Sequence, residues 1–142
     1  VYTTAGNPVT AAAALATLDV IEEEQLVARS EKLGLLAQEF FEQAAQRYTF
    51  IGDVRLYGLN GGIDIIDSSG MPDNVATTKL IYRIFELGAI MISLRGNTLR
   101  FQPPLVITEK QLTHAFNIIE QAFSELAHGY LTLPETDNHI GW

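Results

Sequence analysis

The stretch just before the C-terminal tail constrains the fold more than any other part of this sequence. Its apolar residues recur at the helical period almost without a break: Leu112, Ala115, Phe116, Ile119, Ala122, Phe123 and Leu126. An apolar face of this length must be covered by a second layer of structure. Thr108 and Gln111 have capping-box spacing in front of it, and Gly129 is placed to end it. We therefore expect a long final helix that buries one face.

The rest of the chain alternates between helical and strand patterns. Three more helices are expected: one from the Asn7-Pro8 cap to the Glu22–Glu24 run, one with an apolar stripe from Leu26 to Ala44, and one from about Asn74 to Leu87. Strands are expected over residues 51–55, 58–66, 89–94 and 98–102, with Gly61 and Gly62 marking a bulge or a close backbone approach. The order ααββαββα predicts one α+β domain over residues 1–142, with a small, mainly antiparallel sheet and helices packed on one face.

Composition excludes several classes of function. The chain has 142 residues, 47% of them apolar, and a formal charge of −8 that argues against a nucleic-acid surface. It has no cysteine, which excludes disulfides and zinc–thiolate sites and favours a reducing cytoplasm. No apolar run approaches the roughly 20 residues of a membrane span, and no segment resembles a signal peptide. We expect a soluble, cytoplasmic protein that binds neither nucleic acid nor membrane.

Acid–base and metal chemistry find little support in the sequence. The Glu22–Glu24 run is typical of a solvated helix end. His114, His128 and His139 have no metal-ligand spacing, either with one another or with a carboxylate. No Ser or Thr has a nearby base in sequence that would activate it as a nucleophile. We therefore expect no metal site.

Two places could bind an anionic group. Thr3 and Thr4 lie just before a helix N-terminus, where hydroxyls and backbone amides can hold a phosphate; an ordinary capped loop is the alternative. Arg100 lies in the alternating stretch Thr98–Gln102, where its side chain shares the polar face with Thr98 and Gln102. A guanidinium fork suits a substrate carboxylate, and a salt-bridged or solvent-facing arginine is the alternative. Arg55, after Asp53, is interpreted as structural.

Three segments together resemble the C-terminal third of the pyridoxal-phosphate (PLP)-dependent class-III aminotransferase family. They are Thr3–Pro8 with the Ala-rich helix and Leu18–Glu22 behind it, Ile51–Arg55 with Gly58-Leu59, and Asn97–Phe101 leading to Pro103–Leu105. They stand in the family's order and cover nearly the whole chain. The resemblance implies the α+β fold of the family's C-terminal small domain.

Within the family, the chain looks most like the amino-acid epimerases and racemases, the group of isoleucine 2-epimerase. The segments that carry this likeness are Gly58–Ile63, Leu99–Ile107 and Ile140–Trp142. The family's ordinary aminotransferases usually have Gly after Asp-Val-Arg, whereas Leu56-Tyr57 stands there in this chain. This departure favours an epimerase. A 4-aminobutyrate-type aminotransferase is the alternative.

The resemblance also implies roles for individual residues. Thr3, with Thr4 beside it, matches the family's Thr that hydrogen-bonds the PLP phosphate across the dimer interface. Arg100 matches the Arg that binds the substrate carboxylate. The whole enzyme is therefore expected to bind PLP and a small amino acid, and to form a homodimer or a dimer of dimers.

The family's catalytic lysine precedes the Thr motif, and none of Lys32, Lys79 and Lys110 matches it. The sequence also begins inside the Thr3–Pro8 motif without an initiator Met. We therefore expect a fragment without the N-terminal and large PLP-binding domain, with no catalytic residue and no activity alone. Its first residues should be poorly ordered, and helix 9–23 should expose an apolar or small-residue surface. A free-standing binding or dimerisation module is the alternative of another class.

Overall fold

A computed structural model of the chain describes residues 6–133. In that range the elements follow the order expected from the sequence, and the α+β class is confirmed. They are α1 (Pro8–Glu23), α2 (Leu26–Arg47), β1 (Ile51–Tyr57), β2 (Asn60–Ile65), α3 (Asn74–Glu86), β3 (Ile92–Leu94), β4 (Thr98–Phe101) and α4 (Glu109–Ala127). No helix within this range is long and apolar enough to cross a membrane.

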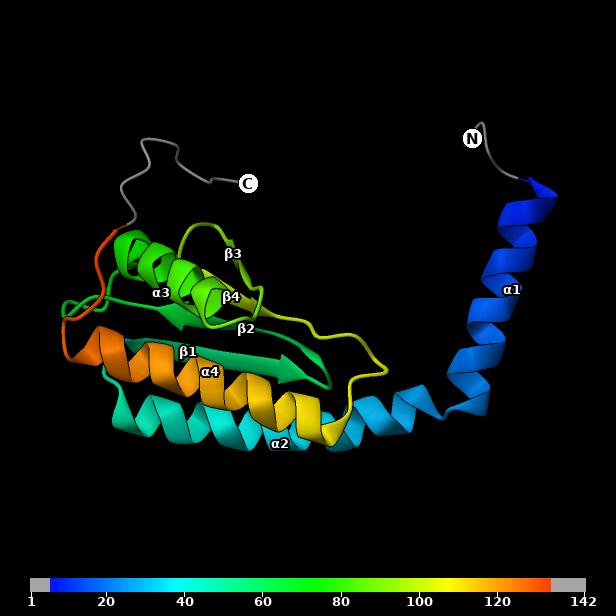
Figure 1. Cartoon of the computed structure of the whole chain (residues 1–142), viewed down its shortest axis with the longest axis horizontal. Helices are drawn as coiled ribbons and strands as arrows, with labels where there is room; N and C mark the ends of the chain where they lie inside the picture. Colours follow the sequence, from blue (N-terminus) through cyan, green and yellow to red (C-terminus); the bar gives the residue numbers. More distant parts are fainter. Residues whose placement is uncertain (1–5, 134–142) are drawn as a thin grey trace.

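The four strands form one antiparallel sheet in the order β1-β2-β4-β3. One face of the sheet is buried and carries Ile51, Ile63, Ile65, Leu99 and Phe101. The same core includes the apolar residues of α2, α3 and α4. In Figure 1 these three helices lie against the sheet, and α1 extends away from it. The opposite face of the sheet, called the open face below, carries the alternate strand residues.

Aromatic side chains join α2, β4 and α4 in the core. Phe41 is fully buried and lies edge-on to Phe101 and Phe116, at ring-centroid distances of 5.4 Å and 6.3 Å. Phe40 stacks on Phe116 at 4.4 Å. Such pairs contribute about 0.5–1.5 kcal/mol each beyond the area they bury. The apolar stripe expected in the final helix faces this core, and the capping box of Thr108 is present.

The strand expected over residues 89–94 is wrong in its first half, because β3 begins at Ile92. Gly88 has a φ of 100° and ends α3. The amides of Gly88 and Ala89 donate to the carbonyls of Phe85 and Ile84, each at 3.0 Å. This Schellman arrangement uses an amide that a strand would need for its ladder. The chain therefore enters the sheet only after Met91.

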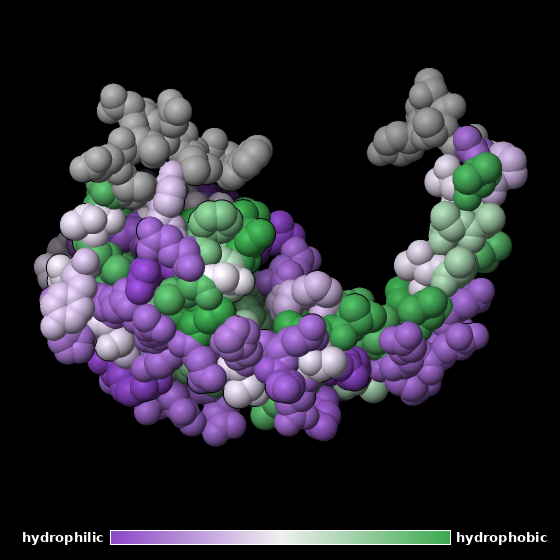
Figure 2. Space-filling view, in the orientation of Figure 1, coloured by the Kyte–Doolittle hydropathy of each residue, from purple (hydrophilic) through white to green (hydrophobic). Residues whose placement is uncertain are grey.

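In the described part of the chain α1 contacts α2 near their junction but buries none of its residues. Asn7 caps it by accepting hydrogen bonds from the amides of Val9 and Thr10, and none of its residues is buried. Gln25, with a φ of 53°, separates it from α2. Figure 2 shows apolar residues along its surface. The exposed surface expected for helix 9–23 is confirmed; the expectation for the first residues lies outside the described range.

Candidate substrate-carboxylate site

Arg100 projects from the open face of the sheet, as the alternation of its strand predicted. Leu99 and Phe101 on either side of it are buried in the core, whereas Thr98 and Arg100 are half-buried on the opposite side. The strand is anchored through these two core residues. The position of the guanidinium is therefore set by a packed element of the fold and not by a loop.

One residue from each strand contributes to a row across the open face through Arg100. Arg55 of β1 pairs with Gly62 of β2, Gly62 pairs with Arg100 of β4, and Arg100 pairs with Ile92 of β3. Residues paired in this way point to the same face of a sheet. A Cβ on Gly62 would lie 2.7 Å from Cγ2 of Thr98. A Cβ on Gly61 would collide with the backbone carbonyl oxygen of Arg55, so the close backbone approach expected at the Gly61-Gly62 pair is confirmed at Gly61.

The first arginine of this row, Arg55, is held by two carboxylates. Its Nη1 donates to Asp53 at 2.6 Å, and its Nη1 and Nη2 donate to the two carboxylate oxygens of Asp64 at 2.8 Å and 2.7 Å. Thr98 adds a hydroxyl hydrogen bond to Asp64 at 2.7 Å. The hydrogen bonds from Arg55 lower the pKa of Asp64, and the hydrogen bond from Thr98 lowers it to a smaller extent. The structural role expected for Arg55 fits this pairing.

The second arginine of the row, Arg100, has no such partner. No ion pair or side-chain hydrogen bond joins it to another residue between positions 6 and 133. Its five N–H donors form a planar fork that matches a carboxylate, and partial burial limits competition from water. Arg100 is therefore chemically suited to bind an anion of carboxylate geometry. Arg55, two strands away in the same row, is not, because its guanidinium is already paired.

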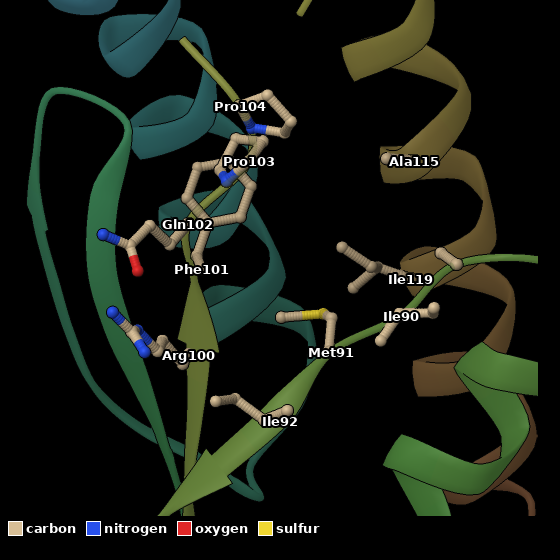
Figure 3. Close-up of a pocket in the computed structure, with 11 residues that line it drawn as sticks. Ile90, Met91, Ile92, Arg100, Phe101, Gln102, Pro103, Pro104, Ala115 and Ile119 are labelled. Carbon is tan, nitrogen blue, oxygen red and sulfur yellow. The ribbon is translucent and has the colours of Figure 1, made fainter. Parts of the chain in front are cut away.

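A cavity of about 310 Å³ lies beside this strand, between the β3–β4 segment and α4. Its lining is mainly aliphatic and includes Met91, Ala115 and Ile119. Figure 3 shows that Arg100 and Gln102 point away from Ala115 and Ile119. Arg100 and Gln102 are themselves among the residues that line this cavity, but their polar ends are directed toward the open face of the sheet.

The proposed phosphate-binding residues, Thr3 and Thr4, lie outside the described residues. Next to them the structure begins at Gly6, followed by the helix cap. Asn7 Oδ1 accepts from the amides of Val9 at 2.9 Å and Thr10 at 3.4 Å. These first amides of α1 are thus already bonded within the chain. The role of Thr3 and Thr4 stays a prediction.

The three lysines do not occupy an enclosed site. Lys32 is exposed and lies 3.7 Å from Glu109, Lys110 is exposed, and Lys79 is half-buried on α3. Residues 6–133 also contain no group of three or more His, Asp or Glu side chains that could hold a metal ion. His128 instead bonds through Nδ1 to the carbonyl of Ser124 at 2.7 Å.

Sequence reasoning missed two residues around Arg100. Asp64 binds Arg55 and accepts a hydrogen bond from Thr98, and Ile92 lies directly opposite Arg100. The alternation within β4 and the adjacent glycines of β2 were the available signals. Neither could give the pairing between strands, because that pairing depends on residues far apart in the sequence.

The aminotransferase class-III family model matches residues 2–123 of the chain. The chain is 49% identical over 99% of its length to isoleucine 2-epimerase from Lentilactobacillus buchneri, covering 32% of that protein. It is 41% identical over 89% of its length to an alanine/serine racemase from Pyrococcus horikoshii, covering 27% of it. Against a probable 4-aminobutyrate aminotransferase from Bacillus subtilis, identity is 35% over 83% of the chain and 28% of the relative.

Solved structures of similar fold are also aminotransferases and transaminases. The acetylornithine aminotransferase from Elizabethkingia anophelis matches with a TM-score of 0.78 and 37% identity, over 88% of this chain and 32% of that one. An amine transaminase from an uncultivated Pseudomonas species, in its PLP-bound form, matches with a TM-score of 0.79 and 29% identity, over 87% and 29%. The chain spans about a third of the length of these proteins. With a family model that covers most of its length, the chain belongs to the aminotransferase class-III family.

Proposed function

We propose that this chain is the C-terminal domain of a PLP-dependent enzyme that acts on amino acids, and that the whole enzyme is an epimerase or racemase like isoleucine 2-epimerase. The observation that carries the proposal is Arg100, an outward guanidinium without a carboxylate partner in residues 6–133, on a packed strand. Sequence identity supports epimerisation over transamination, because it is 49% to the epimerase, 41% to a racemase and 35% to an aminotransferase.

In this proposal Arg100 binds the carboxylate of the amino-acid substrate. Two parallel N–H···O bonds would fix the carboxylate in the plane of the guanidinium and thereby orient Cα. Charge-assisted hydrogen bonds of this kind are worth about 1.5–3 kcal/mol each. Arg55 is a poorer candidate for this role, because Asp53 and Asp64 already bind its guanidinium.

PLP is the proposed cofactor of the whole enzyme, where it acts as an electron sink. We propose that the described residues do not hold PLP by themselves. Lys32 and Lys110 are exposed, Lys79 lies half-buried on a helix, and Asn7 caps the amides of α1, which supports this proposal. Thr3 and Thr4 are proposed to hydrogen-bond the PLP phosphate across the interface of a homodimer or a dimer of dimers. The catalytic lysine and the remaining cofactor contacts would come from outside this chain.

The exposed surface of α1 supports the proposal that other parts of the enzyme complete the site. Val9, Leu15, Leu18 and Val20 are exposed on a helix that buries none of its residues. We propose that the rest of the enzyme covers this surface, and that the enzyme is cytoplasmic.

The alternatives are a 4-aminobutyrate-type aminotransferase and a non-catalytic binding or dimerisation module. Incubating the full-length protein with L-isoleucine, with and without a keto acid, separates them by chiral chromatography of the products. A 2-epimer formed without keto acid supports the epimerase. Consumption of the amino acid only with a keto acid identifies an aminotransferase, and no turnover in either mixture favours the module.

Substitution of Arg100 in the full-length enzyme tests its role. Arg100→Lys keeps the charge but loses the planar fork, so KM for amino acids should rise. Arg100→Ala should lower kcat/KM by roughly 100-fold or more, while PLP absorbance is retained. Arg95→Lys, on the turn of the same hairpin, is the matched control. A kcat/KM for Arg100→Ala within about threefold of wild type would make Arg100 an ordinary strand arginine.

The chain alone should not bind PLP covalently at one site. Mixing the 142-residue chain with a low concentration of PLP, reducing with borohydride and mapping the adduct should give only weak, scattered labelling of lysines. Stoichiometric labelling of a single lysine among Lys32, Lys79 and Lys110 would contradict the proposal that the catalytic lysine lies elsewhere.

A further inference from the structure

The alternation of residues in β3 is inverted relative to the rest of the sheet. Ser93 pairs with the buried Leu99 and lies on the core side, whereas Ile92 and Leu94 pair with Arg100 and Thr98 on the open face. Ile92 is 37% exposed and Leu94 is 46% exposed. A strand with one buried face ordinarily places its aliphatic residues inward and its polar residues outward.

This inversion is imposed by the neighbouring strand. Leu99 and Phe101 must face the core, which fixes the face of every residue in β4 and, through the ladder, in β3. β3 is also an edge strand. Exposed aliphatic residues at a sheet edge favour edge-to-edge association, so proteins usually place charged residues there. We therefore expect the partly exposed side chain of Ile92 to be covered by a ligand or by another protein surface.

Ile92 is placed to contact whatever Arg100 binds. The two residues are directly opposite in an antiparallel pair, where Cβ atoms lie about 4.5–5.5 Å apart. Ile92 and Arg100 also both line the cavity beside β4. On the other side of Arg100 the row offers no side chain at Gly62, and then an arginine whose charge Asp64 and Asp53 already balance.

We propose, on the basis of the proposed function, that Ile92 is a specificity-determining residue of this site. It contacts the aliphatic side chain of the amino acid whose carboxylate Arg100 binds, and Leu94 extends the same surface along β3. The row then reads, from β3 to β1, as an aliphatic contact, a carboxylate anchor, a gap at glycine and a neutralised arginine. A substrate with one carboxylate and a branched aliphatic side chain matches it.

The test compares substrates in the full-length enzyme. Ile92→Thr keeps β-branching and strand propensity but replaces apolar carbon with a hydroxyl. The ratio of kcat/KM for isoleucine to that for alanine should fall roughly 10-fold, with kcat/KM for alanine nearly unchanged. Ile92→Val should retain the wild-type ratio within about threefold. Val75→Thr, an exposed position at the start of α3, is the matched control.

A binding measurement accompanies the kinetics. 3-Methylpentanoate and acetate carry a carboxylate without an amino group, so they report contact with Arg100 and Ile92 without turnover. As competitive inhibitors, their ratio of inhibition constants should shift by the same factor in Ile92→Thr and stay constant in Val75→Thr.

Two outcomes would overturn the inference. An equal loss for isoleucine and alanine together with a lower Tm would show that Ile92 packs against another part of the enzyme. Unchanged ratios in Ile92→Thr would show that it contacts neither substrate nor protein. In both cases Arg100→Lys tests the proposed function separately. A raised KM for amino acids would leave the role of Arg100 standing. An unchanged KM would contradict that role in addition to the role of Ile92.

Discussion

α1 and α2 are consecutive helices with opposite relations to the core. α1 has 16 residues and none of them is buried, whereas α2 has 22 residues and buries six of them, including Phe41. Both have clear local signals, and α1 has the better N-cap, since Asn7 bonds two of its amides. Local signals therefore define where each helix begins and ends, but of the two only α2 buries residues within the described part of the chain.

The same contrast separates the two arginines of the open face. Arg55 is held by Asp53 and Asp64 and belongs to the framework of the sheet, whereas Arg100 has no partner in the described residues. In each pair, the member with its contacts satisfied maintains the fold. The other member has no such contacts within the described residues, which is why the proposed function assigns it a role outside this domain.

The largest change in the free energy of unfolding should come from α2, the helix that packs in the core. Phe41→Ala removes a fully buried ring that contacts Phe101 and Phe116, and should lower the free energy of unfolding by about 3–5 kcal/mol. Leu15→Ala, at a site 62% exposed on α1, should change it by less than about 0.5 kcal/mol. Urea unfolding of the chain, followed by near-UV circular dichroism, measures both; equal losses would break the contrast between α1 and α2.

A smaller, pH-dependent effect should come from the framework arginine. The folded-state pKa of Asp64 is lowered by Arg55 and Thr98, so its ionised form stabilises the fold above the unfolded-state pKa. That contribution is lost as pH falls through the folded-state pKa. Asp64→Asn should therefore cost at most about 1 kcal/mol at pH 7, because Arg55 is half exposed to solvent, and the difference from wild type should vanish in acid.

The matched control for this prediction is Asp19→Asn in exposed α1, which should leave the unfolding free energy unchanged at pH 7. Unfolding curves at several pH values between neutral and acid give the comparison. A difference between wild type and Asp64→Asn that grows as pH falls would have the wrong sign and contradict the assignment.

The smallest effect on the folded body should come from the cap of α1. Asn7→Ala removes an N-cap, which costs a helix about 1 kcal/mol. Because no α1 residue is buried, the unfolding midpoint of the sheet and of α2–α4 should stay the same. Hydrogen exchange should become faster only in α1 amides. A lower midpoint for the body would show that α1 is coupled to it.

Much of the fold follows from the sequence because its signals are local. The capping box at Thr108, the stripe of the final helix and the alternation around Arg100 each depend on residues within a few positions of one another. The strand expected over 89–94 was wrong at its start because two neighbouring signals competed. Gly88 ends α3, and the amide of Ala89 is used to close that helix.

By itself, the sequence determined the order of the elements, their caps and the outward direction of Arg100. Only the tertiary structure decided which residues surround that arginine. Three of these contacts join separate strands: Gly62 pairs with Arg100, Arg100 pairs with Ile92, and Asp64 of β2 binds Arg55 of β1. Strand register depends on how two distant segments bury their apolar residues together. Each strand's own pattern gives its two faces but not its neighbour across the ladder, so the site became visible only in the assembled sheet.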